Sequence, residues 1–319
     1  MTARLHHLLS MEDLDAAMIE LILDTAHKLH EIADRPIKKV PTLRGRTVCN
    51  MFLEDSTRTR LSFDLAAKRL SADVLTFTGK GSSVSKGESF RDTALTLKAM
   101  GIDAVVVRSH SSGAPQQLAS YIDVPVLNAG DGWHQHPTQA LLDLYTMRHH
   151  LGDLSQLHVA VIGDILHSRV ARSEVQGLRT MGARVTIVAP PTLLPPSIQG
   201  WGVDVVRSID DIIDDIDVAY LLRVQHERMQ GGFFPSSREY ARIWGMNGDR
   251  LRRMKAGSIV MHPGPMNRGV EITSEVADHK RAVISDQVTN GIAVRMAVLY
   301  LLLGGGPEGA GHASAEVMA

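Results

Sequence analysis

Residues 47–60 read Thr-Val-Cys-Asn-Met-Phe-Leu-Glu-Asp-Ser-Thr-Arg-Thr-Arg. The first seven are mostly apolar, which predicts a buried strand over residues 47–53. The last five carry hydroxyl groups and arginines and lead into an apolar pattern at helical spacing, so we expect a helix over residues 57–70. A buried strand that turns directly into a helix is typical of βαβ units and a parallel sheet.

The same alternation of apolar runs and helical patterns continues along the chain and restarts after Gly152. The predicted fold class is therefore α/β, with two lobes, each a parallel sheet flanked by helices. A first helix is expected after a cap at Ser10. The predicted strands cover residues 47–53, 73–77, 104–108, 125–128, 158–162, 184–188, 203–206, 217–221 and 258–261.

The composition limits the classes of function. The 319 residues include 34 Lys and Arg against 35 Asp and Glu, so there is no basic excess to bind nucleic acid. No apolar stretch approaches the roughly 18 to 20 residues of a membrane span, and the first residues lack a signal-peptide core, which predicts a cytoplasmic protein. The single cysteine, Cys49, allows no internal disulfide and is expected to be buried.

An anion-binding site is predicted where the first strand meets its helix. Ser56, Thr57 and Thr59 bring hydroxyl groups to a helix N-terminus, and Arg58 adds a guanidinium. Backbone N–H groups and the helix dipole favour phosphate at such a position. An ordinary helix cap with solvated arginines is the alternative. The run lacks the Gly-x-x-x-x-Gly-Lys frame of a P-loop and does not indicate a nucleotide.

Two further motifs of the first half carry polar groups. Ser82 and Lys86 lie in a hydroxyl-rich loop, which by itself is typical of a mobile surface segment. His136 is expected to cap a long helix, with Gln139 one turn further on. A neutral imidazole at a helix N-terminus can donate a hydrogen bond to a carbonyl oxygen. The alternative is a metal pair of His134 and His136, although no matching third ligand is evident.

Several polar groups follow predicted strands, where open parallel sheets bind their ligands. Arg108 ends one strand, and Arg169 follows another in a segment that lacks the glycines of a dinucleotide site. Arg223 and Gln225 come after a third strand, where a planar guanidinium suits a carboxylate, although a surface ion-pair network is the alternative. Two prolines in residues 262–265 fix a turn whose carbonyl groups can accept hydrogen bonds from an amine.

Taken in order, these motifs resemble the transcarbamoylase family. The resemblance covers about Leu8 to Leu303 and implies a carbamoyl-group transferase without a metal or cofactor. It also implies that two interdomain helices link the lobes, with one domain at residues 1–137 plus 291–319 and the other at residues 138–290. The His-Pro-Gly-Pro turn, in place of His-Cys-Leu-Pro, and the Arg-Val-Gln segment imply aspartate as the acceptor. Its α-amino group would attack carbamoyl phosphate, releasing phosphate and giving N-carbamoyl-L-aspartate for pyrimidine synthesis. The motifs lie at residues 56–60, 82 with 86–88, 136–139, 223–225 and 262–265.

The resemblance also implies a role for each motif residue. The groups that stabilise the reacting centre would be Arg58, Thr59, Arg108 and His136. Carbamoyl phosphate would be bound by Ser56, Thr57, Arg58, Thr59, Arg108, His136, Gln139, Gly264 and Pro265, with Ser82 and Lys86 from a neighbouring subunit. Aspartate would be bound by Lys86, Arg169, Arg223 and Gln225, with Glu54 as the partner of such an arginine.

The sharing of Ser82 and Lys86 between subunits implies an obligatory homotrimer. Association with a regulatory chain or a dihydroorotase stays open. Two rival functions also stay open: a transcarbamoylase with another acceptor such as ornithine, and a non-catalytic subunit of a pyrimidine-pathway complex. No dedicated base for the amine is evident, so the departing phosphate is a candidate to take the proton.

Overall fold

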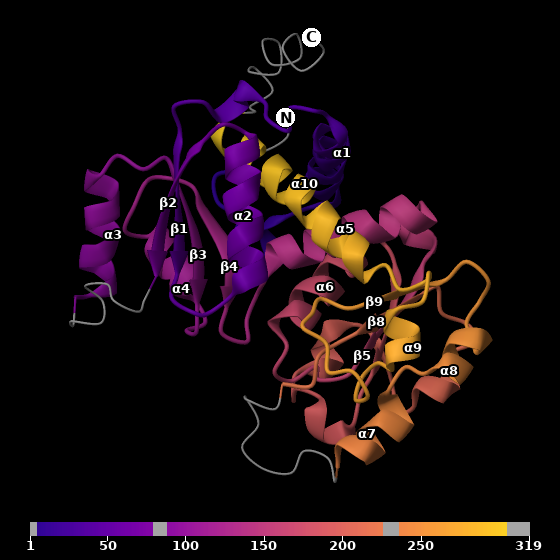
Figure 1. The fold of residues 1–319 in the computed structure, drawn as a ribbon. Coiled ribbons are helices and arrows are strands. Elements are labelled where there is room, and N and C mark those ends of the chain that lie inside the picture. Colours follow the sequence, from indigo (N-terminus) through magenta and orange to yellow (C-terminus); the bar gives the residue numbers. More distant parts are fainter. Residues whose placement is uncertain (1–4, 79–87, 226–235, 305–319) are drawn as a thin grey trace. The chain divides into compact units, whose positions relative to one another are not determined.

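A computed structural model describes residues 5–78, 88–225 and 236–304. The chain divides into two compact units, residues 1–142 with 290–319 and residues 143–289 (Figure 1). Both boundaries fall inside helices, α5 (Pro137–Leu151) and α10 (Ile284–Leu303). Each unit is an α/β fold with one all-parallel sheet, so the predicted fold class is confirmed.

The first unit is built on four parallel strands in the order β2-β1-β3-β4. The chain crosses the sheet one way from β1 to β2 and the other way from β2 to β3. Right-handed crossovers therefore place α2 on one face and α3 with α4 on the other. The strands are β1 (Thr47–Phe52), β2 (Asp73–Thr78), β3 (Ala104–Ser109) and β4 (Val126–Asp131), and the helices include α1 (Ala16–His30), α2 (Thr57–Arg69), α3 (Phe90–Ala99) and α4 (Ala114–Ala119).

Apolar side chains of α3 and α4 form a core against one face of this sheet. Leu97 and Leu118 pack in a cluster with Cys49 of β1 and Val105 of β3. Cys49 and Val105 are paired neighbours in these two strands, and their side chains point to the same face of the sheet. Burial raises the pKa of the Cys49 thiol to about 11. The thiol therefore stays protonated and acts as a small apolar group, as the sequence predicts.

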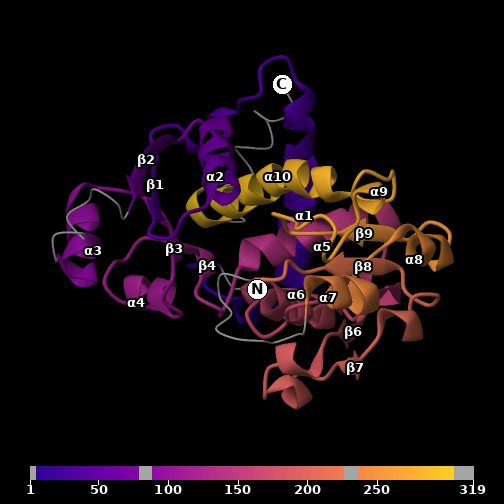
Figure 2. The same cartoon turned by 60° about the horizontal axis from the view of Figure 1, so that its bottom comes forward.

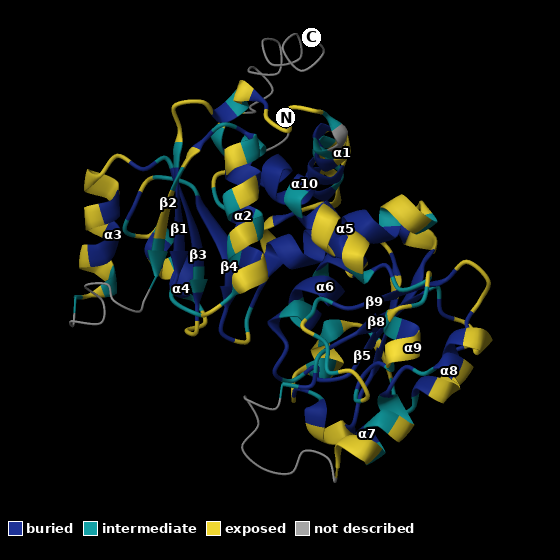
Figure 3. Cartoon of the chain, in the orientation of Figure 1, coloured by how far each residue is buried: buried dark blue, intermediate teal, exposed yellow. Residues whose placement is uncertain are grey.

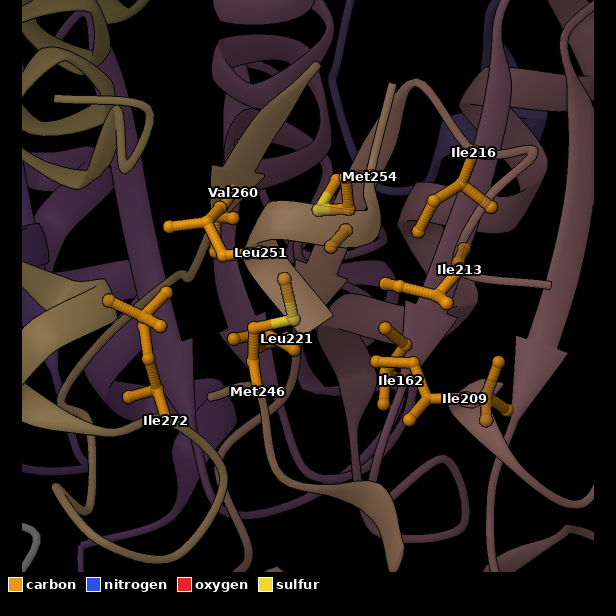
Figure 4. Close-up of a cluster of buried hydrophobic side chains, with 14 residues drawn as sticks. Ile162, Ile209, Ile213, Ile216, Leu221, Met246, Leu251, Met254, Val260 and Ile272 are labelled. Carbon is orange, nitrogen blue, oxygen red and sulfur yellow. The ribbon is translucent and has the colours of Figure 1, made fainter. Parts of the chain in front are cut away.

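The second unit has five parallel strands in the order β7-β6-β5-β8-β9 (Figure 2). One face packs Ile162, Leu221 and Val260 against Met246 and other side chains from the helical segments after β7 and β8 (Figure 4). The strands are β5 (His158–Ile162), β6 (Arg184–Val188), β7 (Asp204–Val206), β8 (Val218–Leu221) and β9 (Ile259–Met261), and the helices include α6 (Arg169–Thr180), α7 (Ser237–Trp244), α8 (Gly248–Arg253) and α9 (Ser274–Ala277).

The central strands of each unit are buried and drawn dark blue, whereas the edge strands β2 and β7 and the outer turns of α2, α3 and α7 are partly exposed (Figure 3). The predicted first helix differs at its start. Ser10 caps a short 3-10 helix at Met11–Asp13, and α1 has its own cap at Asp15, which accepts from the N–H of Met18 at 2.7 Å. Within the described residues, no helix is long and apolar enough to span a bilayer.

Candidate active site

The strand order identifies one position in the first unit where polar loops gather. From β1 the chain runs outward to β2, then returns to β3 on the other side of β1. The loops that follow β1 and β3 therefore diverge, and α/β sheets bind ligands at the carboxyl ends of such a strand pair. Residues 54–59 follow β1, and Arg108 lies in the last two residues of β3.

An ion pair joins these two strands at that edge. Nη2 of Arg108 donates to Oε1 of Glu54 at 2.7 Å, and the two side chains are 12% and 10% exposed. Nη1 of Arg108 also donates to the carbonyl oxygen of Ala129 after the start of β4, at 3.1 Å. The guanidinium thus bridges the ends of β1 and β3 and the backbone of β4.

The hydroxyl-rich segment forms the start of α2, as predicted. Ser56 is the N-cap, and its Oγ accepts from the backbone N–H of Thr59 at 3.4 Å. Thr59 is buried, whereas Thr57 and Arg58 are exposed. An anion that approaches this helix end from solvent therefore meets a guanidinium and a hydroxyl before it meets the backbone.

Asp131, which our sequence analysis missed, organises the loop between β4 and α5. The side chain is fully buried and accepts four hydrogen bonds. Its position between two glycines at the end of an apolar strand was the available signal. The donors are Asn128 Nδ2 at 2.7 Å, Gln135 N at 3.0 Å, Gly113 N at 2.7 Å and His134 Nδ1 at 3.0 Å.

This loop leads into α5, and His136 and Gln139 lie at the start of that helix. His136 directly precedes Pro137, and its carbonyl oxygen accepts from the N–H of Gln139 at 2.9 Å. Both side chains are buried.

The metal-pair alternative needs a third ligand, and the described residues hold no group of three or more His, Cys, Asp or Glu suited to a metal ion. His134 instead directs its ring to Asp131.

The second unit repeats the arrangement around β5 and β8. The chain runs from β5 out through β6 and β7 and returns to β8 on the other side of β5. Arg169 begins α6 after β5, capped by Ser168, while Arg223 and Gln225 follow β8 and are half-buried. Oδ2 of the buried Asp164 accepts from the N–H of Gln225 at 3.3 Å, which ties the two loops together.

The proline turn follows β9 at the same edge of the second sheet. Gly264 adopts a left-handed φ of 62°, and the bond from Gly264 to Pro265 is cis. Nδ2 of Asn267 donates to the carbonyl oxygen of Val224 at 3.2 Å. This contact links the turn to the loop that carries Arg223 and Gln225.

Within each unit, the described residues predicted for the site thus lie at the carboxyl edge of the sheet, in its loops, at strand ends or in the first turn of the helices that follow. In the first unit these loops follow β1, β3 and β4, and in the second unit they follow β5, β8 and β9. Ser82 and Lys86 lie outside the described residues.

Two family profiles match the chain. The aspartate/ornithine carbamoyltransferase carbamoyl-P binding domain matches residues 6–149, and the Asp/Orn binding domain of the same family matches residues 155–302. The chain belongs to the aspartate/ornithine carbamoyltransferase family. The family predicted from the motifs is therefore confirmed.

Other members of the aspartate/ornithine carbamoyltransferase family are similar along nearly the whole chain. The aspartate carbamoyltransferase catalytic subunit of Acidothermus cellulolyticus is 61% identical over 311 residues, which cover 97% of this chain and 96% of that one. The aspartate transcarbamoylase of Trypanosoma cruzi in complex with N-(phosphonacetyl)-L-aspartic acid has a TM-score of 0.84 and 31% identity, covering 93% of this chain and 95% of that one. Its complex with carbamoyl phosphate and aspartate also has a TM-score of 0.84 and 31% identity, covering 93% and 96%.

Proposed function

We propose that the protein is an aspartate carbamoyltransferase. It transfers the carbamoyl group of carbamoyl phosphate to the α-amino group of L-aspartate, giving N-carbamoyl-L-aspartate and phosphate, in pyrimidine biosynthesis. One observation carries the proposal: each unit presents its own set of anion-binding groups at the diverging loops of its sheet. Two different anionic substrates require two such sets. The names of the relatives support this reading.

The first unit supplies the groups for carbamoyl phosphate. Ser56, Thr57 and the start of α2 bind the phosphate together with Arg58. Negative charge that develops on the carbonyl oxygen is met by Thr59, Arg108 and His136. The Glu54 pair holds the Arg108 guanidinium in place before substrate arrives. Such preorganised donors stabilise the transition state without reorganisation during the reaction.

The second unit supplies the groups for aspartate. Arg169, Arg223 and Gln225 bind its two carboxylates, because guanidinium and amide donors match carboxylate oxygens. The turn at Gly264 and Pro265 accepts hydrogen bonds from the carbamoyl amino group, assisted by Gln139. Residues 1–137 plus 291–319 then form the carbamoyl phosphate-binding domain and residues 138–290 the aspartate-binding domain.

Positioning and charge account for the chemistry. Fixed cations screen the repulsion between two anionic substrates, and holding the amine against the carbonyl carbon removes much of the entropic cost of their encounter. The attack expels phosphate, which takes the proton that the amine loses. This scheme assigns no step to a metal or cofactor.

Further features of the proposal concern assembly. Ser82 and Lys86 complete the site of a neighbouring subunit in a homotrimer. Association with a regulatory chain or a dihydroorotase, and the cytoplasmic location, stay predictions from the sequence.

A bisubstrate inhibitor and an acceptor panel test the function. Purified protein with carbamoyl phosphate should release phosphate with aspartate as the acceptor and not with ornithine. N-(phosphonacetyl)-L-aspartate should inhibit far more tightly than phosphate or aspartate alone, because it occupies both sets of groups. Turnover with ornithine would support the rival acceptor. No turnover with any amino acid would support the non-catalytic reading.

A further inference from the structure

Behind the proline turn, the second unit holds a chain of buried polar side chains. Gln287, in the first turn of α10 and 3% exposed, accepts at Oε1 from the backbone N–H of His262 at 2.9 Å. Its Nε2 donates to Oδ1 of Asp143 at 2.7 Å. Oδ2 of Asp143 in turn accepts from the hydroxyl of Tyr220 at 2.6 Å. One amide therefore joins the end of β9 to α5 and, through Asp143, to β8.

A second buried acid completes this chain. Glu174 of α6 is fully buried and lies beside Asp143. Two ionised carboxylates offer only acceptors, so a hydrogen bond between them requires a proton on one of them. Among the described residues, no N–H or O–H donor reaches either carboxyl oxygen of Glu174. Burial, and then the charge of Asp143, hold the pKa of Glu174 well above its usual range, so Glu174 is the group that keeps the proton.

At the other end of the chain, His262 is held by both its backbone and its ring. Nδ1 accepts from the backbone N–H of Gly264 at 2.8 Å, so the ring proton lies on Nε2 and is donated to Oε1 of Glu271 at 3.2 Å. The turn that starts at residue 263 therefore leaves β9 in a defined direction. The titratable groups in this series of buried polar side chains are Asp143, Glu174, Tyr220, His262 and Glu271.

We propose that Gln287 is a positioning residue for the turn at residues 263–265, and that Asp143, with the buried Glu174 beside it, holds Gln287 in place. The inference rests on the proposed function, in which this turn accepts hydrogen bonds from the amino group of carbamoyl phosphate. Gln287 itself contacts no substrate. Displacement of the turn weakens the binding of ligands that carry this amide nitrogen. It leaves the binding of inorganic phosphate unchanged, because the first unit binds phosphate.

Gln287→Met tests the positioning role, because methionine keeps the volume and removes both hydrogen bonds. Phosphonoacetamide, a stable phosphonate that keeps the amide nitrogen, should bind about tenfold more weakly, with phosphate binding unchanged, in calorimetric titrations. Val288→Met is the matched control, since Val288 neighbours Gln287 on α10 and is 54% exposed. Unchanged phosphonoacetamide binding, or an equal loss for both ligands, would overturn the inference. If the wild type itself does not bind phosphonoacetamide, the proposed function fails instead.

Glu174→Gln tests whether Glu174 keeps a proton in the folded protein, and the test does not depend on the folding of the first variant. Glutamine keeps a donor toward Asp143 and does not ionise. The folded wild type retains one proton that the unfolded chain releases above the ordinary carboxyl pKa, so its stability falls as pH rises toward the raised pKa. Above about pH 5 its unfolding constant should rise with pH relative to Glu174→Gln, by up to about tenfold per pH unit until the pH passes the raised pKa, in urea titrations at fixed protein concentration. Parallel pH profiles for the two proteins would show that Glu174 holds no such proton.

Discussion

Single charged residues set the chemistry at both sheet edges, and they do so in two ways. Exposed groups such as Arg58 face solvent, from which an anion arrives, whereas Arg108 is mostly buried in an ion pair with Glu54. Buried acids such as Asp131 and Asp164 contact no solvent and shape the loops that carry the site. Substitution of an exposed cation should therefore lower turnover alone, whereas substitution of a buried acid should also lower the free energy of unfolding.

Arg58→Ala should lower turnover at least about a hundredfold, because the variant lacks a cation that offsets phosphate charge in the transition state. The fold should be intact, since the side chain is exposed. Steady-state kinetics with circular dichroism would measure both. Arg46→Ala is a suitable control: Arg46 is also exposed, pairs with Asp103 at 2.7 Å and lies at the amino end of β1, away from the site. Near-normal turnover in folded Arg58→Ala would contradict the assigned phosphate site.

Asp131→Asn should lower the free energy of unfolding by about 2 to 3 kcal/mol, because an amide nitrogen would face N–H donors that the carboxylate now accepts. Turnover should fall as well, since the same loop leads to His136. Urea unfolding and kinetics would test both effects. Asp123→Asn provides the comparison, because its carboxylate is 85% exposed and pairs only at the surface with Lys98. Equal stability of the two variants would refute the role of Asp131.

At the scale of elements, the junction between β5 and α6 depends on a glycine. Gly163 has a φ of +127°, and a Cβ there would lie 2.9 Å from the Tyr240 hydroxyl and 3.0 Å from the carbonyl oxygen of Leu222. Gly163→Ala should therefore destabilise by about 2 to 4 kcal/mol through strain and overlap together. Gly152 has a φ of +83°, and a methyl group there would lie in open space. Gly152→Ala should therefore lower the free energy of unfolding by only about 1 kcal/mol. Thermal unfolding of both variants would compare the two costs, and equal losses would mean that the overlap relaxes freely.

The elements also show where sequence patterns predict well and where they do not. Strands β5 and β6 have the predicted bounds, because a buried parallel strand is a continuous apolar run bounded by polar residues. The short helices α4 and α9, of 6 and 4 residues, were not predicted, since so few residues show no helical period. Ser10 caps a 3-10 turn rather than α1 because Asp15 offers a second cap nearby.

At the scale of the whole molecule, the proposed trimer predicts complementation between two inactive chains. Arg58→Ala and Lys86→Ala should each be nearly inactive alone, because each lacks one cation of the shared site. When both chains are co-expressed in equal amounts, about a quarter of the sites in random trimers should combine an intact Arg58 with an intact Lys86 from the neighbour. Activity of the purified mixture, with sedimentation to verify trimers, measures this fraction. Activity no greater than the sum of the two variants would show that sites are not shared.

Local patterns in the sequence were sufficient for the α/β class, for the family and for the motif residues at strand ends. Apolar periodicity and short motifs depend on neighbours along the chain, which the sequence displays directly. The partners of these motifs were decided only by tertiary structure. Glu54 meets Arg108, and Asp143 meets Gln287, 144 residues away, because strand order and register bring them together. A buried acid gains its role from whatever donors surround it, and no local pattern encodes those distant donors.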